Sequence, residues 1–421
     1  MTERLFQFIW QHQYFNKSEL MTQQGELLSV IHPGHLNTHQ GPDFLSAKIR
    51  VGETLLAGNI ELHLRALDWN RHGHDKDKNY ENVILHVVWE DDGFLLAGVS
   101  TLVLAARVSG LLLGKYEEWM KNRAFVPCGG RVAELSALSV LSWLERMGVE
   151  RLERKRTQVM NLFMECRNSW DECLWRMVAR NFGLPCNAPV FEELAVSLPL
   201  NQLRRHFHQP LMVEAMLLGQ AGLLGEVARD DYTQKLKSEF EFYNAKYKFP
   251  KLHGRLQFLR MRPSSFPAIR LSQLAMLLCS GCLRFSLWKE CVNIGALGEM
   301  LDVQSAVYWT DHSAPGRSSQ PKPKKVGRQM AENIIINSLV PLMYSYGKMH
   351  DEQNTAEKAV EWLISLKAEN NVLIRGWEDQ GFRCRNAWES QSLIELKKQY
   401  CDERKCLDCG IGKQLLKSEK S

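Results

Sequence analysis

The spacing of apolar side chains changes near Ser136, and this change constrains the fold more than any other feature of the sequence. Before Ser136, apolar residues fall in short alternating runs that end at Gly, Pro or Asp, a pattern typical of half-buried β-strands. Over residues 136–380 they recur at helical spacing, with few alternating runs. The pattern predicts an α/β N-terminal domain followed by a mainly α-helical domain.

Individual elements follow from the same periodicities. Residues 2–15 carry apolar side chains close to helical spacing, so we expect a first helix before the strands. The alternating runs predict strands over 27–31, 47–51, 60–64, 83–89 and 94–97. Helices are expected later in the chain, for example over 138–159, 171–182, 210–224, 232–247 and 326–346.

At 421 residues the chain is long enough for two or three domains. We expect an α/β domain over 1–125, an all-helical domain over 126–380 and a small Cys-rich segment over 381–421. The net charge of +5 permits nucleic-acid binding but does not argue for it. The sequence has no signal-peptide pattern and no apolar run of the roughly 18 residues that a membrane span needs. We therefore expect a cytoplasmic protein that does not bind membranes.

The stretch from Gly41 to His63 carries the chemistry that points most directly to a reaction. Asp43 opens one expected strand. Glu61 and His63 lie two residues apart on the next, where alternation puts both on one face. Carboxylates from neighbouring strands can hold a divalent cation that activates water for hydrolysis of a phosphodiester. The alternative is structural, because Pro-Asp is common in turns and Glu-x-His occurs by chance.

Histidines are concentrated around this stretch, since seven of the 13 lie between positions 32 and 86. His72 and His74 belong to a polar loop that directly follows the Glu61 strand, so both can lie over the same site. Imidazole there could bind a metal or a phosphate, or transfer a proton. The alternative is a solvated loop whose histidines cap turns. A different zinc site remains open, built from His32, His35, His39 and His86.

The order of helix, strand, Pro-Asp strand, Glu-x-(basic) strand, loop and strand resembles the core of the PD-(D/E)xK nuclease superfamily. The resemblance implies a restriction-endonuclease-like mixed sheet flanked by helices. It also implies that Asp43 and Glu61 bind Mg²⁺ or Mn²⁺, and that His63 takes the place of the usual lysine. The whole chain also resembles an uncharacterised bacterial domain-of-unknown-function family, through stretches such as those from Gly58 to His63 and from Tyr400 to Cys409.

Four cysteines near the C-terminus have the spacing Cys384-x16-Cys401-x4-Cys406-x2-Cys409. Four thiolates can close a tetrahedral zinc site or hold an iron–sulfur cluster, and the two-residue gap in the last pair is typical of metal-binding turns. We expect Zn²⁺ ahead of an iron–sulfur cluster, in a segment that is too small for a core of its own. The alternative is a set of scattered thiols in a polar tail.

Basic residues cluster on one expected helix, at Arg151, Arg154, Lys155 and Arg156, and also flank the Pro-containing loop 262–270. Such groups can bind the phosphates of DNA or RNA, which are the partners we expect. The simpler interpretation of any single cluster is a solvated helix face.

These features lead to one principal hypothesis, a metal-dependent nuclease-like protein that hydrolyses nucleic-acid phosphodiesters. Its expected catalytic residues are Asp43, Glu61, His63, His72 and His74. The rival hypothesis is a non-catalytic nucleic-acid-binding or scaffold protein that keeps the nuclease-like fold. The sequence has no GxxxxGK[ST] loop, no HExxH motif and no GxSxG elbow, so the enzyme classes that use them lack support.

Overall fold

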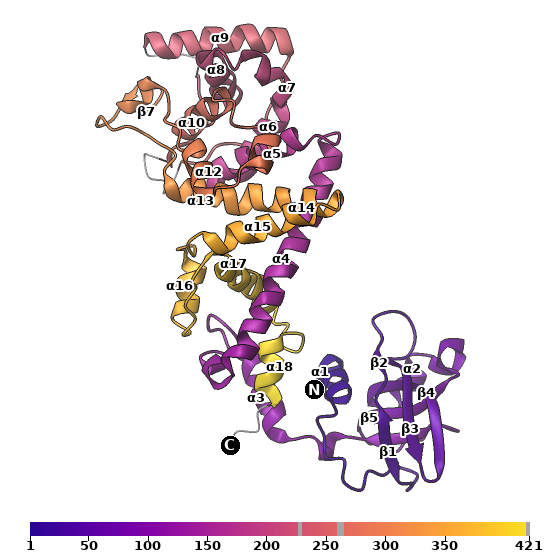
Figure 1. Ribbon diagram of the computed structural model, residues 1–421. Helices are drawn as coiled ribbons and strands as arrows, with labels where there is room; N and C mark the ends of the chain where they lie inside the picture. Colours follow the sequence, from indigo (N-terminus) through magenta and orange to yellow (C-terminus); the bar gives the residue numbers. More distant parts are fainter. Residues whose placement is uncertain (226–229, 259–264, 418–421) are drawn as a thin grey trace. The chain divides into compact units, whose positions relative to one another are not determined.

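The computed structural model describes residues 1–225, 230–258 and 265–417, and it divides the chain into two compact units (Figure 1). The first unit contains Met1–Trp143 together with the described part of Leu396–Ser421. The second contains Leu144–Glu395. The three-part division expected from the sequence therefore changes, because the C-terminal residues complete the first unit and do not form a segment of their own.

A six-stranded mixed sheet forms the centre of the first unit, with the order β1-β3-β4-β5-β6 and the short β2 paired to β3. The β1–β3 and β3–β4 pairs are antiparallel, whereas the β4–β5 and β5–β6 pairs are parallel. A two-residue turn with Gly52 at positive φ joins β3 to β4. The strands are β1 Leu28–His32, β2 His35–Leu36, β3 Phe44–Val51, β4 Thr54–Arg65, β5 Val83–Glu90 and β6 Ser100–Val103.

The expected strand at 94–97 is wrong, because these residues form a loop. Gly93 and Gly98 flank the run with φ angles of 77° and 76°, and such conformations turn an extended chain. The strand that follows β5 in the sheet, β6, begins only at Ser100, where it pairs in parallel with β5. The other four expected strands correspond to β1, β3, β4 and β5.

Helix α1, Glu3–His12, packs an apolar face against the sheet, and its contacts include β4. The helix begins after Thr2, whose side chain accepts a hydrogen bond from the backbone of Leu5. The buried ring of Phe6 meets Trp89 of β5 edge to face, at 5.6 Å between ring centroids. Short helical segments connect β4 to β5, namely α2 Asp68–Arg71, η1 His74–Lys76 and η2 Lys78–Tyr80.

The C-terminal residues of the first unit pack onto helix α3, Gly110–Lys121. The guanidinium group of Arg404 donates hydrogen bonds to the carbonyl oxygens of Trp119 and Asn122, both at 2.7 Å. Helix α18, Gly410–Lys417, lies against α3. A segment this short has too little core of its own, so its apolar residues are buried only by packing on a neighbour.

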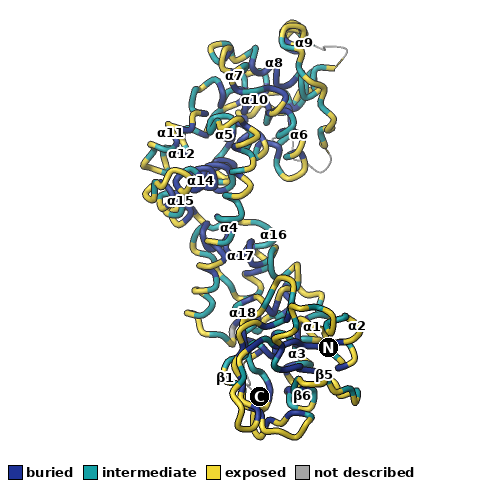
Figure 2. The backbone as a smooth tube through the Cα atoms, turned by 90° about the vertical axis from the view of Figure 1, so that its right-hand side faces the viewer, coloured by how far each residue is buried: buried dark blue, intermediate teal, exposed yellow. Residues whose placement is uncertain are grey.

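The second unit is mainly helical, as the sequence predicts, and one apolar core runs through it (Figure 2). A short hairpin of β7, His312–Ala314, and β8, Arg317–Ser318, interrupts the helices. Within the described ranges of the whole chain, no helix combines the length and the apolar character that crossing a bilayer requires. The helices are α4 Ala137–Glu165, whose first residues are counted with the first unit, α5 Trp170–Phe182, α6 Leu184–Ser197, α7 Leu200–Leu203, α8 Pro210–Gln220, α9 Asp231–Tyr247, α10 Pro267–Cys279, α11 Phe285–Glu290, α12 Ile294–Leu301, α13 Arg328–Ile334, α14 Val340–Met349, α15 Gln353–Ser365, α16 Val372–Glu378 and α17 Ala387–Leu396.

Candidate metal centre

Asp43, Glu61 and His63 come from neighbouring parts of the central sheet. Asp43 immediately precedes β3, and the other two lie on β4, which pairs antiparallel with β3. Glu61 is 6% exposed and His63 is 1% exposed, so both are buried. Because β4 also pairs with β5, His86 of β5 lies directly across from Glu61. The strand order therefore brings together polar residues from three segments of the chain.

The two carboxylates are held by reciprocal hydrogen bonds. The backbone N–H of Asp43 donates to Oε2 of Glu61 at 2.9 Å, and the backbone N–H of Leu62 donates to Oδ2 of Asp43 at 3.1 Å. The amide of Gln7, on α1, donates to Oδ1 of Asp43 at 2.7 Å. Both oxygens of Asp43 and one oxygen of Glu61 thus accept hydrogen bonds from the protein itself. The second oxygen of Glu61, Oε1, faces the histidines.

Two histidines lie beside this oxygen, and a third lies close to both of them. One ring nitrogen from each of His63, His72 and His74 lies within 4.8 Å of the other two, and among the described residues no further set of three potential ligands is this close. Oε1 of Glu61 lies 3.6 Å from Nε2 of His63 and 3.4 Å from Nε2 of His74. Metal–nitrogen bonds of about 2.0–2.1 Å place ligand atoms roughly 3–4 Å apart, so this spacing suits one cation between the rings.

The loop after β4 brings His72 and His74 to the centre. The backbone N–H of His72 donates to the carbonyl of Asp68, which closes the short helix α2. Gly73 then adopts a φ of 75°, a left-handed conformation that reverses the chain between the two histidines. The ring centroids of His72 and His74 lie 5.1 and 5.2 Å from that of His63. A polar loop with one glycine is therefore enough to deliver both rings.

His86 fixes the orientation of His63. Nδ1 of His63 lies 2.8 Å from Nε2 of His86, so one of the two nitrogens donates a hydrogen bond to the other. When Nδ1 of His63 is the donor, its Nε2 carries a lone pair that faces Glu61. A hydrogen bond from the second ring nitrogen is the usual way in which a metal-binding histidine is oriented.

Two aromatic side chains restrict the rings further. Tyr80 stacks on His74, with 3.8 Å between the ring centroids. The edge of Trp69 meets His74 at 5.4 Å and His86 at 5.3 Å. Trp69 is itself buried. His74 and His86 are thus packed into fixed orientations, which lowers the entropic cost of ordering them around a ligand.

The electrostatics of the centre favour neutral histidines. Burial lowers the pKa of His63 to about 2 and that of His86 to about 4, because a charged imidazolium is poorly solvated there. Neutral imidazole is the form that binds metals. Nε2 of His63 and Nε2 of His74 are buried and have no hydrogen-bond partner among the described residues. Unpaired buried nitrogens are uncommon and cost free energy, so these residues fit a cation that would use both.

The carboxylates of the centre favour protonation when no cation is bound. Burial, and next the negative charge of Asp43, raise the pKa of Glu61 to about 9. Burial also raises the pKa of Asp43, against the hydrogen bonds from Leu62 and Gln7, which lower it. The buried carboxylate of Glu61 and the half-buried one of Asp43 repel each other when both are ionised, and a divalent cation removes that cost.

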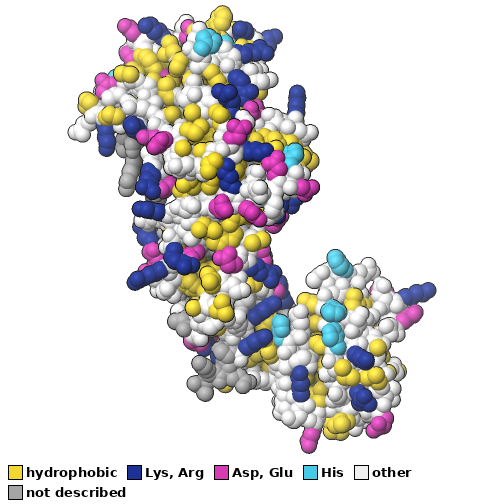
Figure 3. Space-filling model, in the orientation of Figure 1, with side chains coloured by type: hydrophobic (Ala, Val, Ile, Leu, Met, Phe, Trp, Pro, Cys, Tyr) yellow, Lys and Arg dark blue, Asp and Glu magenta, His cyan; other side chains and the backbone are white. Residues whose placement is uncertain are grey.

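The four histidines of the alternative zinc site, His32, His35, His39 and His86, do not form one group. His86 lies against His63, as described above. The rings of His32 and His35 lie 4.9 Å apart, but Nδ1 of His32 accepts a hydrogen bond from the backbone of Gly34 at 3.1 Å. His35 and His39 are exposed, and several histidine side chains are visible on the surface of the first unit in Figure 3.

Sequence reasoning did not assign Gln7 to the site, and it considered His86 only for a different one. His86 had a detectable signal, since it is a polar residue in the middle of the apolar run 83–89. Gln7 had none, because an amide on an amphipathic helix is ordinary. Its role follows from the packing of α1 beside β4.

The basic cluster of α4 is used inside the second unit. Arg154 donates two hydrogen bonds to the carboxylate of Glu395, at 2.7 and 2.6 Å, and Arg151 lies 3.8 Å from the same carboxylate. These pairs link α4 to α17, so both guanidinium groups are already paired with a carboxylate of the protein. Of the expected basic loop 262–270, residues 262–264 lie outside the described residues.

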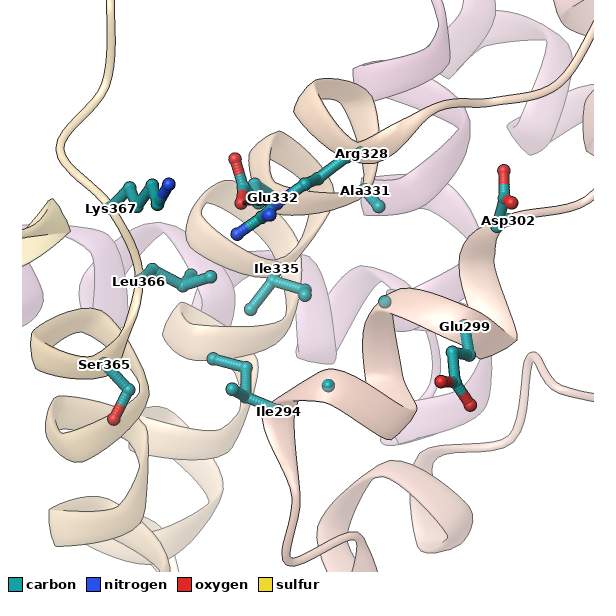
Figure 4. A pocket seen from close by; sticks show the side chains of 12 residues that line it. Ile294, Glu299, Asp302, Arg328, Ala331, Glu332, Ile335, Ser365, Leu366 and Lys367 are labelled. Atoms are coloured by element: carbon teal, nitrogen blue, oxygen red, sulfur yellow. Dashed lines mark hydrogen bonds and ion pairs between the residues drawn. The ribbon is translucent and has the colours of Figure 1, made fainter.

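A pocket of about 540 Å³ opens in the second unit between α12, α13 and the end of α15. In Figure 4, Ile294, Ile335 and Leu366 line its apolar part, and charged side chains stand at its edges. Arg328 at one edge is paired with Glu332 at 2.8 Å. Its lining contains no histidine or cysteine, so this pocket lacks the ligands that the first unit gathers.

Comparison with known proteins gives one match. A family model described as "Protein of unknown function (DUF2851)" matches residues 3–372. No curated protein and no solved structure matches the chain. The matched range includes every residue of the histidine centre and ends before Cys384.

Proposed function

Because the chain belongs to DUF2851, a family of proteins of unknown function, we propose a function from the centre itself: the first unit is a metal-dependent hydrolase of nucleic-acid phosphodiesters. One observation carries the proposal. His63, His72 and His74 bring one nitrogen each within 4.8 Å of the others, Glu61 lies beside two of them, and two of these nitrogens are buried without another partner. Three imidazoles near a carboxylate are a donor set that hydrolytic metal sites use.

The donor set favours Zn²⁺ over the Mg²⁺ or Mn²⁺ expected from the sequence. Imidazole nitrogen suits Zn²⁺ and related transition metals, whereas Mg²⁺ prefers oxygen ligands. Asp43 offers little to Mg²⁺, because both of its oxygens accept hydrogen bonds from Gln7 and Leu62. We therefore assign the cation to the three histidines and give Asp43 a supporting role.

Each residue has a distinct part in hydrolysis. When bound, Zn²⁺ supplies Lewis acidity and lowers the pKa of water at the centre. Oε1 of Glu61, beside His63 and His74, is placed to accept the proton of the attacking water. Trp69 and Tyr80 pack against the rings and keep bulk water away from their far side.

Asp43 and His86 are positioning residues. The backbone N–H of Asp43 holds Oε2 of Glu61, which leaves Oε1 directed at the histidines. The ring of His86 holds Nδ1 of His63, which directs Nε2 to the same point. The centre therefore depends on residues that need not touch the cation.

The choice of phosphodiesters rests on the resemblance to PD-(D/E)xK nucleases. In support, Asp43 precedes one strand, Glu61 and His63 lie on its antiparallel neighbour, and the next strand along the chain is parallel to that neighbour. In this interpretation His63 does not imitate the usual lysine. It contributes a metal ligand at the position where the nuclease pattern has a cation.

The rival function is nucleic-acid binding or scaffolding without catalysis. It is favoured by the pKa of Glu61, which burial raises to about 9, because a protonated Glu61 is no base. Under this rival the full chain binds DNA or RNA in a salt-dependent manner, and added metal produces no cleavage.

The test uses the purified full chain, stripped with a chelator and reloaded separately with Zn²⁺, Mn²⁺ or Mg²⁺. Metal content and cleavage of single- and double-stranded DNA and RNA are measured for wild type, His72→Ala and His39→Ala. We expect Zn²⁺ binding at the centre and cleavage in wild type. His72→Ala should lose both, and His39→Ala should retain both, because His39 is exposed and outside the centre.

Two results would count against the proposal. Equal metal binding and cleavage in wild type and His72→Ala would remove the assigned centre. Metal binding without cleavage of any substrate, together with salt-dependent nucleic-acid binding, would establish the rival.

A further inference from the structure

The first unit also holds four cysteines that belong to neither the sheet nor the histidine centre. Cys128 lies in the loop that follows α3. Cys401, Cys406 and Cys409 lie in the segment that leads into α18. The packing of α18 against α3 and against the turn η4, Arg131–Glu134, joins the two segments.

Two sets of backbone contacts shape the loop that carries Cys128. Arg404 of the C-terminal segment caps the carbonyl of Asn122, as described above. The side chain of Asn122 donates to the carbonyl of Pro127 at 3.0 Å, and the backbone N–H of Gly129 donates to the carbonyl of Val126 at 3.1 Å. These bonds curl the loop around Cys128, next to the segment that supplies the other three cysteines.

The turn between Cys406 and Cys409 has the construction of a metal-binding knuckle. The sulfur of Cys409 accepts hydrogen bonds from the backbone N–H groups of Ile411 and Gly412. A Cβ atom at Gly412 would lie 2.3 Å from the carbonyl oxygen of Cys406, so only glycine fits there. N–H groups aimed at a sulfur stabilise the negative charge of a thiolate.

Cys401 ends a π-helical turn, η9 Lys397–Cys401, that returns the chain toward Cys406. The backbone N–H of Arg404 donates to the carbonyl of Cys401 at 3.2 Å, and Arg404 adopts a left-handed φ of 51°. A non-glycine residue in this conformation marks a strained turn. This turn lies between Cys401 and Cys406 and reverses the chain there.

The four thiols act on one another electrostatically. Ionised neighbours at Cys128 and Cys409 raise the pKa of both Cys401 and Cys406. Burial is the larger cause, and it raises the pKa of Cys406 to about 12 and that of Cys128 to about 11. The four side chains therefore lie near enough to affect one another's charge, and two of them, Cys406 and Cys409, are buried.

Cys384, which the sequence pattern placed in this set, has different surroundings. It belongs to the second unit. The groups that raise its pKa after burial are three carboxylates, Glu389, Glu378 and Glu369. The C-terminal spacing pattern does not include Cys128, because about 270 residues separate Cys128 from Cys401 and no spacing rule spans such a distance.

We propose that Cys128, Cys401, Cys406 and Cys409 bind one Zn²⁺ as four thiolates, in a site that ties the C-terminal segment to the loop after α3. Four thiolates leave no coordination position open, so the site is structural and not catalytic. Zinc–sulfur bonds of about 2.3 Å draw the four sulfur atoms closer together than they lie as free thiols. Zinc binding thereby links the N-terminal part of the first unit, through Cys128, to the C-terminal segment.

The experiment uses the full chain, stripped of loosely bound metal, and a thiol-specific mercurial that displaces zinc from cysteine but not from histidine. We expect one equivalent of zinc to be released from wild type and from His72→Ala, and none from Cys128→Ser. Cys128→His should restore binding, because a Cys₃His set also holds zinc. Cys384→Ser and Cys279→Ser are matched controls that should keep the full equivalent.

A second measurement guards against a Cys128→Ser protein that does not fold. In wild type, alkylation of each cysteine is followed by mass spectrometry, with and without zinc. We expect zinc to slow alkylation of the four cysteines at least tenfold and to leave Cys282 unaffected. Equal labelling rates with and without zinc would overturn the proposal. So would loss of zinc from Cys384→Ser with retention in Cys128→Ser, or the finding of iron and sulfide in place of zinc.

Discussion

Two buried acidic clusters of this protein differ in whether the chain itself balances their charge. In the second unit, Glu395 is 2% exposed, and Arg154 and Arg151 both pair with its carboxylate. In the first unit, Glu61 is buried to a similar degree, but the groups beside its free oxygen are neutral imidazoles. The Glu395 cluster is complete, whereas the Glu61 cluster lacks a positive charge.

This difference separates a structural site from a ligand site. A buried carboxylate that is paired within the protein needs nothing further. A buried carboxylate among neutral nitrogens, two of which have no partner, is stable in its ionised form only when a cation is supplied from outside. Four predictions probe this contrast.

The largest expected effect is on catalysis. Glu61→Gln keeps the size of the side chain but removes the base, so we expect phosphodiester cleavage to fall by about 10²–10⁴-fold. Single-turnover cleavage of labelled DNA and RNA measures the loss. Glu53→Gln is the matched control, because Glu53 is an exposed acid in the β3–β4 turn. An unchanged cleavage rate in Glu61→Gln would mean that Glu61 is not the base and that its role, like that of Glu395, is structural.

The next effect concerns stability in the second unit. Glu395→Gln leaves Arg151 and Arg154 buried or half-buried without their partner, which should cost about 3–5 kcal/mol. Hydrogen exchange of the amides of α4 and α17 reports the loss in the unit concerned. A change below about 1 kcal/mol would show that the pair acts as an exposed ion pair. The contrast between the Glu395 and Glu61 clusters would then no longer hold.

A smaller effect is expected for a residue that only orients a ligand. His86→Ala should weaken zinc binding at the histidine centre by about 10–100-fold, because Nδ1 of His63 loses its partner. Isothermal titration of the chelator-stripped protein measures the change, with His35→Ala as an exposed control. Affinity that stays at the wild-type value would remove His86 from the centre.

The smallest step, counted per pH unit, is a pH dependence in the metal-free protein. Burial raises the folded-state pKa of Glu61 to about 9, above its ordinary value of 4.5. Retention of this proton therefore stabilises the fold fully below pH 4.5, and that contribution is lost as the pH rises toward 9. We expect wild type to lose stability relative to Glu61→Gln as the pH rises, by at most about 1.4 kcal/mol per pH unit.

Thermal unfolding of both proteins in the presence of a chelator follows this difference. Saturating Zn²⁺ should abolish it, because a cation keeps Glu61 ionised. A stability difference that is constant across the pH range would mean that Glu61 titrates normally, and the contrast with Glu395 would then lose its electrostatic basis.

Most of the fold could be predicted from the period of the apolar residues. Alternation placed Glu61 and His63 on one face, and a polar loop after that strand placed His72 and His74 nearby. The apolar run 94–97 led to a wrong prediction of a strand, because Gly93 and Gly98 turn the chain and a run of that length is compatible with a loop.

The rest depended on contacts between distant segments. His86 reaches Glu61 only because β5 is the parallel neighbour of β4, and strand order is not written in local periodicity. Asp43 was expected as a metal ligand, yet its oxygens accept bonds from Gln7 and Leu62. Cys128 could not be assigned to the cysteine site from the sequence for the same reason, since the loop that carries it meets the C-terminal segment only in the folded unit.

The hydrogen bonds of Arg404 to the end of α3 have a consequence for biosynthesis. The residues that cover α3 leave the ribosome only after the intervening ~250 residues of the second unit, which at roughly 5–20 residues per second takes tens of seconds. For that time the nascent first unit lacks the C-terminal segment that packs onto α3. Folding of the first unit can therefore finish only after the second unit has been synthesised.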